Sequence, residues 1–217
     1  MSEAVNPISY YDSHAEGFAR QASDKHVNRF EYEQNMPSLL SLCHQVSGNV
    51  LDYGCGAGNF TTMLQRDDRI VDGCDASQQL LSIARKSYPG ISFYTATEIG
   101  KTDSQKTYDL IVAKLVFHYV ENLEVVLANM RRALKEGGHL LFSVPHPDKT
   151  RRHFDSDVDE AAYTDEVGTF GMTLQMVHRS TTRLDTLLLD NGFRTIKTDT
   201  VTDGNIPKRL NILAVKQ

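Results

Sequence analysis

The chain has 217 residues, of which 23 are basic and 28 acidic, giving a formal net charge of −5 at pH 7. This length predicts one domain with a substantial hydrophobic core, and we expect no second catalytic domain. The acidic balance provides no basic face for nucleic acid, so a small molecule or a protein is favoured as the partner over RNA or DNA.

The N-terminal segment predicts helices. A weakly amphipathic pattern indicates a helix over residues 9–21, and a second helix is expected over residues 27–46. The first seven residues lack a basic region followed by an apolar run, and about 18 consecutive apolar residues occur nowhere in the chain. We therefore expect a cytoplasmic protein that does not enter a membrane.

A glycine-rich turn follows the first predicted strand. The strand is expected over residues 49–53, and Gly54, Gly56 and Gly58 alternate after it. Glycine has no Cβ that would block positive φ or collide with a nucleotide-like molecule across the strand end, so cofactor binding is the first hypothesis. The nicotinamide fingerprint G-x-G-x-x-G requires its third glycine at the position of Asn59, which weakens the dehydrogenase interpretation.

The second predicted strand ends in a carboxylate. Residues 70–75 are typical of a strand and finish at Asp75, about 21 residues after Gly54. A doubly wound fold places its ribose-binding acid at this separation. One carboxylate there can accept hydrogen bonds from both ribose hydroxyls.

The rest of the chain alternates predicted helices and strands. The further strands are expected over residues 91–95, 108–113, 138–144, 193–201 and 209–215. Helices separate the first three of these strands, as a parallel sheet requires, and Asn122 is the expected N-cap of the helix before the fifth strand. The last two strands are close enough in sequence to form an antiparallel pair.

Two motifs occur in order along the chain. Asp52 lies two residues before the glycine turn, and the strand-like segment Thr107–Ala113 precedes a helix end, a double-glycine turn and a strand over Leu134–Phe142. With these motifs most of the chain resembles the class I S-adenosylmethionine-dependent methyltransferases, whose first motif is acid-x-Gly-x-Gly-x-Gly and whose second strand ends in an acid. The resemblance implies a Rossmann-like α/β fold with a doubly wound, seven-stranded sheet, mostly parallel with an antiparallel edge strand, and helices on both faces. It also implies S-adenosyl-L-methionine as the cofactor.

The resemblance assigns most cofactor contacts to the first two strand ends. The three glycines would pass under the methionine and ribose, and Asp75 with the following Ala76 would hold the ribose hydroxyls. Asp52 would order the turn or contact the methionine ammonium.

Other cofactor contacts follow from the same resemblance. Backbone groups of Ala96 and Thr97 would face the adenine, although the chain has threonines where family members often carry an acid, so this register stays open. Ala113 and Lys114 would lie beside the methionine, with a surface position as the alternative for Lys114. Tyr11 would cover the sulfonium or close the site, unless it only anchors its helix to the core.

The region after the fifth strand is the least regular. It lies where open α/β sheets bind ligands, so we interpret residues 145–180 as a substrate lid, with a solvated surface insertion as the alternative. We expect one methyltransferase domain over residues 1–217, with an N-terminal helical segment over about 1–46. Arg151 and Arg152 in the lid would steer an anionic acceptor, unless the acidic residues after them compensate their charge.

Histidines are the candidate general bases, because imidazole takes up a proton near neutral pH. His118 leads, since it follows the fourth strand near the expected methyl group; a packing role is the alternative. His146, between two prolines after the fifth strand, is second, and His178 is third. Arg179 would bind an acceptor carboxylate or phosphate.

These features favour methyl transfer from S-adenosyl-L-methionine to an oxygen or nitrogen atom of a small-molecule acceptor. Two alternatives stay open: a non-catalytic S-adenosylmethionine-binding regulator or partner subunit, and a nicotinamide-dependent oxidoreductase. Cys43, Cys55 and Cys74 lack zinc-site spacing, so we expect reduced, buried thiols and no metal. The acceptor and the oligomeric state are not set by the sequence.

Overall fold

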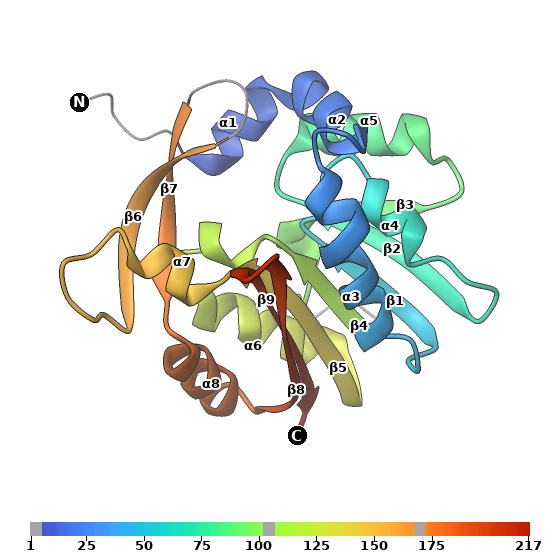
Figure 1. Ribbon diagram of the computed structural model, residues 1–217. Coiled ribbons are helices and arrows are strands. Elements are labelled where there is room, and N and C mark those ends of the chain that lie inside the picture. The colour runs from blue at the N-terminus through green and yellow to red at the C-terminus, as the bar shows by residue number, and fades with distance from the viewer. Residues whose placement is uncertain (1–5, 102–106, 168–171) are drawn as a thin grey trace.

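The sheet of this protein has seven strands in the order β3-β2-β1-β4-β5-β9-β8 (Figure 1). The computed structural model describes residues 6–101, 107–167 and 172–217. The strands of this sheet are β1 (Gly48–Tyr53), β2 (Arg69–Asp75), β3 (Ser92–Thr95), β4 (Tyr108–Lys114), β5 (Leu134–Pro145), β8 (Phe193–Asp203) and β9 (Ile206–Lys216). Every strand that the sequence predicts is therefore present.

The first five strands of this order are parallel neighbours, β9 beside them runs in the opposite direction, and the edge strand β8 returns to the direction of the first five. β9 is antiparallel to both β5 and β8. A two-residue connection, Gly204 and Asn205, joins β8 to β9, and so short a connection permits only an antiparallel pair. The predicted doubly wound, mostly parallel fold is confirmed, with the reversed strand β9 one place inside the edge strand β8.

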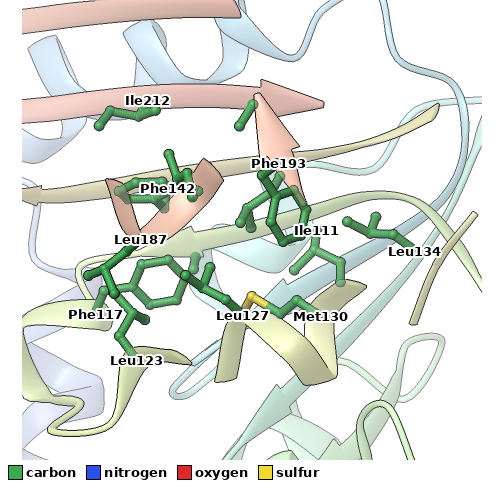
Figure 2. Close-up of a cluster of buried hydrophobic side chains, with 14 of the residues drawn as sticks. Ile111, Phe117, Leu123, Leu127, Met130, Leu134, Phe142, Leu187, Phe193 and Ile212 are labelled. Carbon is green, nitrogen blue, oxygen red and sulfur yellow. The ribbon is translucent and has the colours of Figure 1, made fainter. Parts of the chain in front are cut away.

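Alternate strand residues pack on opposite faces of the sheet. The helices of one face are α3 (Met36–Leu42) and α4 (Asn59–Met63), and those of the other are α6 (Leu123–Ala133) and α8 (Thr181–Asp190). Val50 of β1 packs on the first face, and its neighbour Leu51 packs on the second. Figure 2 shows the second core, where Phe142 and Phe193 of the sheet meet Leu127 and Leu187 of the helices. Burial of each such side chain contributes about 1.5–3 kcal/mol.

The helices before the sheet differ in detail from the prediction. The first expected helix is divided at His14 into α1 (Pro7–Ser13) and α2 (Ala15–Ser23). The second begins later, as a π-helical segment η1 (Glu31–Asn35) that continues into α3. Pro37, in the first turn of α3, has no N–H to donate to the preceding turn, so a regular α-helical ladder cannot run through this point.

Helices α5 (Gln78–Ser87) and α6 begin at polar capping residues. Ser77 caps α5, and the predicted cap Asn122 accepts a hydrogen bond from the Val125 N–H at the start of α6. Two 3₁₀ segments, η2 (Ala96–Glu98) and η3 (Phe117–Tyr119), follow β3 and β4. Within the described ranges no helix is long and apolar enough to cross a membrane.

The predicted lid consists of a short helix and a β-hairpin. These elements are α7 (Pro147–Arg151), β6 (Glu160–Val167) and β7 (Met172–Arg179). The hairpin is a separate two-stranded sheet that stands off the main sheet and reaches α1, where Tyr10 packs with Tyr163 and Leu174 (Figure 1). Residues 168–171 of the predicted lid and residues 1–5 of the N-terminal segment lie outside the described residues.

Candidate functional site

A cavity of about 700 Å³ lies at the carboxyl ends of β1, β2 and β4, where open α/β sheets bind ligands. We call one part the turn end, because the glycine turn and the end of β2 line it. The other part, lined by α7, the hairpin and β9, is the hairpin end. The turn end includes Gly54, Gly56, Asp75, Ala76 and Ala96, and the hairpin end includes His118, Lys149, Arg152, Tyr163, Asp165 and Arg209.

Most of the residues that the sequence singles out line this cavity. They are Tyr11, Asp52, Gly54, Gly56, Asp75, Ala76, Ala96, Lys114 and His118. Of the expected cofactor contacts and the two leading histidines, four lie outside its lining: Gly58, Thr97, Ala113 and His146. Ala113 is fully buried in the core, and the side chain of Thr97 is exposed to solvent.

Asp75 ties the glycine turn to the start of α5. The Gly56 N–H donates to its Oδ2 atom and the Ser77 N–H to its Oδ1 atom, both at 2.8 Å. Each carboxylate oxygen keeps a lone pair for another donor. Burial raises the pKa of Asp75, while these backbone donors oppose that rise.

Gly56 leaves space at the centre of the turn. Its φ is +55°, and a Cβ built there would meet only the Phe18 ring, at 3.4 Å. Gly58 has a different role, since its Cβ would lie 2.9 Å from the Tyr88 ring. Glycine at position 58 therefore allows the Tyr88 ring to pack against the turn, whereas glycine at position 56 leaves room in the cavity.

Asp52 is a buried carboxylate at the end of β1. It is 1 % exposed, and the Thr61 hydroxyl donates to its Oδ2 atom at 2.7 Å. Burial raises its pKa to about 6. Asp52 thus joins β1 to α4 and orders the turn between them, while lining the cavity.

The end of β4 leads into a strained turn. Leu115, which lines the cavity, has φ +57°, a left-handed conformation that costs a bulky residue about 1–2 kcal/mol. Its N–H donates to the Ser143 carbonyl oxygen at 2.9 Å, which holds the turn in place. Backbone strain of this kind is characteristic of functional sites.

Glu31 connects the two ends of the cavity and has no local sequence signal. Its Oε1 atom lies 2.7 Å from Arg209 Nη2, and its Oε2 atom lies 4.0 Å from Lys114 Nζ. Burial opposes ionisation of Glu31, but these two cations and a hydrogen bond from Asn35 lower its pKa overall. Lys114 is thereby directed into the site and is not a free surface lysine.

Helix α1 closes the cavity over the turn. The Tyr11 hydroxyl donates to the Tyr119 hydroxyl at 3.0 Å, and its ring packs edge-on against Phe18. Asp12 accepts a 2.5 Å hydrogen bond from the Ser77 hydroxyl, which attaches α1 to the start of α5. Burial raises the pKa of Tyr11 to about 12, so its phenol stays protonated at neutral pH.

His118 is the predicted histidine that reaches the cavity. It is 7 % exposed, and its Nδ1 atom has no hydrogen-bond partner among the described residues. Burial, aided by the positive charges of Arg209, Arg179 and Lys149, lowers its pKa to about 3. The ring is therefore neutral and only weakly basic at pH 7, and Nδ1 is able to accept a hydrogen bond.

The other two candidate histidines have structural contacts. His146 caps α7, because its Nδ1 atom accepts the Asp148 N–H at 3.3 Å. His178 uses both ring nitrogens, with Nδ1 2.6 Å from Thr150 Oγ1 and Nε2 3.2 Å from the Val158 oxygen. We find neither ring in the lining of the cavity.

Arg179 fastens the hairpin to the loop after β4. It is buried, pairs with Glu160 at 2.7 Å, and donates to the carbonyl oxygens of Phe117, Val120 and Glu121. Its donors are thus engaged within the protein. The structure assigns Arg179 a role in holding the hairpin, in place of the anion-binding role considered from the sequence.

The three cysteines are free and buried, as predicted. Across the described ranges, no group of three or more histidine, cysteine, aspartate or glutamate side chains is arranged to hold a metal ion.

Comparison with known proteins identifies relatives. A family model described as a methyltransferase domain matches residues 24–198. The malonyl-[acyl-carrier protein] O-methyltransferase of Halalkalibacterium halodurans is 36% identical over 107 residues, which are 46% of this chain and 40% of that protein. The trans-aconitate 2-methyltransferase of Acidovorax ebreus is 32% identical over 123 residues, 54% of this chain and 47% of that protein. The chain thus spans less than half the length of either relative.

Solved structures share the fold. The magnesium protoporphyrin IX methyltransferase of Synechocystis PCC 6803, determined with bound SAH (S-adenosylhomocysteine), superposes with a TM-score of 0.68 at 15% identity, and the match covers 97% of each chain. Three observations support the same assignment: the strand order, the glycine turn joined to Asp75, and the match of the family model over most of the chain. This chain belongs to the class I S-adenosylmethionine-dependent methyltransferase family.

Proposed function

We propose that the protein transfers the methyl group of S-adenosyl-L-methionine to an oxygen or nitrogen atom of a small-molecule acceptor. The observation that carries this proposal is a continuous cavity that joins the glycine turn and Asp75 to a second group of polar and charged side chains. Its volume of about 700 Å³ suits small molecules, for which pockets measure about 300–1,000 Å³. The name of one sequence relative, a trans-aconitate 2-methyltransferase, supports a small-molecule acceptor. The name of the other, a malonyl-[acyl-carrier protein] O-methyltransferase, supports transfer to oxygen, although its acceptor is carried on a protein.

The turn end would hold the cofactor. Asp75 offers one lone pair on each carboxylate oxygen to the ribose hydroxyls, since its other bonds go to backbone N–H groups. Gly56 allows the cofactor to approach the backbone, and Ala96 lines the part of the cavity where the adenine would lie. Lys114 and Asp52 offer opposite charges to the methionine carboxylate and ammonium.

The chain contributes alignment to the reaction. When bound, S-adenosyl-L-methionine supplies a methyl group that is already activated by the sulfonium charge. The residues around it orient the acceptor atom toward that methyl group and exclude water, and positioning of this kind accounts for large rate enhancements. The Tyr11 and Tyr119 pair closes the cavity on one side.

His118 would orient the acceptor as a hydrogen-bond acceptor. Its Nδ1 atom is neutral and unpartnered within the described residues, but a pKa of about 3 makes it a poor general base. His118→Ala should therefore slow turnover and leave the affinity for S-adenosylhomocysteine unchanged. Unchanged turnover would remove His118 from the mechanism.

A thermal-shift comparison tests the proposed function. S-adenosylhomocysteine at about a hundred times its dissociation constant should stabilise the fold by about 2.7 kcal/mol, and NAD should not stabilise it. Stabilisation by NAD alone would favour the oxidoreductase alternative. Production of S-adenosylhomocysteine from S-adenosyl-L-methionine in the presence of small-molecule acceptors separates an enzyme from a non-catalytic binding protein.

A further inference from the structure

The hairpin end of the cavity has more cationic than acidic side chains. Lys149, Arg152 and Arg209 line it together with Asp165. Arg209 is already paired with Glu31. Among the described side chains, no carboxylate oxygen lies within 4.0 Å of the Lys149 ammonium or the Arg152 guanidinium, so these two cations have no ion-pair partner there.

Helix α7 places the two free cations on one side. Lys149 and Arg152 are three positions apart, so they lie on the same helical face, and both line the cavity. Arg151, between them, pairs with the exposed Asp157 outside the cavity. The buried Thr150 hydroxyl bonds to His178 Nδ1 at 2.6 Å, which fixes the orientation of α7 against β7.

The pKa values of two groups at the hairpin end, Lys149 and His118, are lowered by burial and in part by neighbouring positive charges. Partial burial lowers the pKa of Lys149, and Arg209, Arg152 and Lys208 lower it further, with Asp165 as a smaller opposing influence. His118, whose pKa is lowered first by burial, is also surrounded by cations. Positive charges that repel one another in a partly buried place are relieved when an anion binds between them.

We propose that the hairpin end is an anion subsite, in which Lys149 and Arg152 bind a carboxylate or phosphate group of the methyl acceptor. This inference rests on the proposed function, because it names the class of its acceptor: a small molecule with an anionic group. Ammonium and guanidinium groups donate charge-assisted hydrogen bonds to such anions. A cationic or neutral acceptor would leave both side chains unpaired at the wall of the cavity.

The subsite is tested by calorimetric titration with three probes: tricarballylate, inorganic phosphate and the neutral triamide of tricarballylate. Wild-type protein should bind at least one of the two anions and bind the triamide at least about tenfold more weakly, because a charge-assisted contact is worth roughly that factor. Tighter binding of tricarballylate indicates a carboxylate acceptor, and tighter binding of phosphate indicates a phosphorylated one.

The adjacent arginine provides the matched control. Lys149→Gln and Arg152→Gln should each weaken binding of the preferred anion about tenfold or more. Arg151→Gln removes the same kind of charge from the outer side of α7 and should change the affinity less than about twofold. Circular dichroism and melting temperature verify that each variant folds.

Two results overturn the subsite: neither anion binds wild type more tightly than the triamide, or Arg151→Gln weakens binding as much as Arg152→Gln. The titrations are made with and without S-adenosylhomocysteine, so that failure of the subsite can be distinguished from failure of the proposed function. Anion binding that Lys149→Gln and Arg152→Gln weaken and Arg151→Gln does not, without binding of S-adenosylhomocysteine, contradicts the proposed function and supports the subsite. Binding of S-adenosylhomocysteine without anion binding contradicts the subsite alone.

Discussion

The two ends of the cavity are assembled in different ways. At the turn end, Gly56 and Asp75 are 19 residues apart and are joined at two neighbouring strand ends by a hydrogen bond from the Gly56 N–H to the Asp75 carboxylate. At the hairpin end, Arg209 pairs with Glu31, which is 178 residues away in the chain, so only the tertiary fold brings these two side chains together. Under the proposed function, cofactor binding would therefore depend mainly on groups that are close in the chain, whereas acceptor binding would depend on side chains brought together by the fold.

The largest expected effect comes from Gly56→Leu. Leucine at φ +55° is strained by about 1–2 kcal/mol, and its side chain would occupy the cavity at the turn. We expect binding of S-adenosylhomocysteine to fall below detection in calorimetry while the fold is retained.

Gly204 provides a control for backbone strain alone. Its φ is +58°, and a Cβ there would have nothing within 4 Å. Gly204→Leu should lower stability by a similar amount and leave the affinity for S-adenosylhomocysteine unchanged. Equal loss of affinity in both variants would contradict the view that the turn end acts through local geometry.

A second substitution tests the buried carboxylate of the turn end. Burial raises the pKa of Asp52 to about 6 from an ordinary 3.8, so ionisation of this group costs the folded state stability as the pH rises through about 6. Asp52→Asn should therefore raise the free energy of unfolding by up to about 3 kcal/mol at pH 8, and this gain should disappear near pH 4. Urea denaturation at the two pH values measures it.

The opposite pH trend would contradict this account of Asp52. A gain that is the same at pH 4 and pH 8 would show that the effect comes from packing and not from charge. Wild-type protein under the same conditions is the reference, and the Thr61 hydroxyl bond can be kept by the asparagine oxygen.

The smallest expected effect concerns the contact that closes the cavity. Tyr11→Phe removes the hydroxyl bond to Tyr119 and keeps the ring against Phe18. We expect a loss of about 0.5–1.5 kcal/mol in unfolding free energy and a change below about threefold in affinity for S-adenosylhomocysteine. Tyr119→Phe should have a similar effect, and the double variant should lose no more than either single one. Additive losses would show that the two hydroxyls act independently.

Sequence reasoning predicts the fold and much of the turn end because their signals are local. Strand periodicity and the spacing from Gly54 to Asp75 are visible along the chain, and both residues line the cavity. Gly58 shows the limit of this reasoning. It belongs to the same motif, yet it lies outside the lining of the cavity, and its φ of +88° and the Tyr88 ring, which is 30 residues further along the chain, together require glycine there.

The hairpin end could be predicted only in part. The sequence does not distinguish Arg151 from Arg152. In the structure Arg151 pairs with Asp157, whereas Arg152 lines the cavity. The weak basicity of His118 depends on burial and on Arg209, which is distant in the chain. The sequence predicts an irregular segment where the strands β6 and β7 form. Their apolar side chains pack on Tyr10 and not on the main sheet, and no local pattern predicts this contact between distant segments.

The most direct test is one calorimetric series with S-adenosylhomocysteine on wild type, Gly56→Leu and the double variant Lys149→Gln/Arg152→Gln. We expect saturable binding to wild type, no detectable binding to Gly56→Leu, and binding to the double variant within about twofold of wild type. Folded wild-type protein that does not bind S-adenosylhomocysteine, or a double variant that loses this affinity as Gly56→Leu does, would contradict the division of the cavity into a cofactor end and an acceptor end.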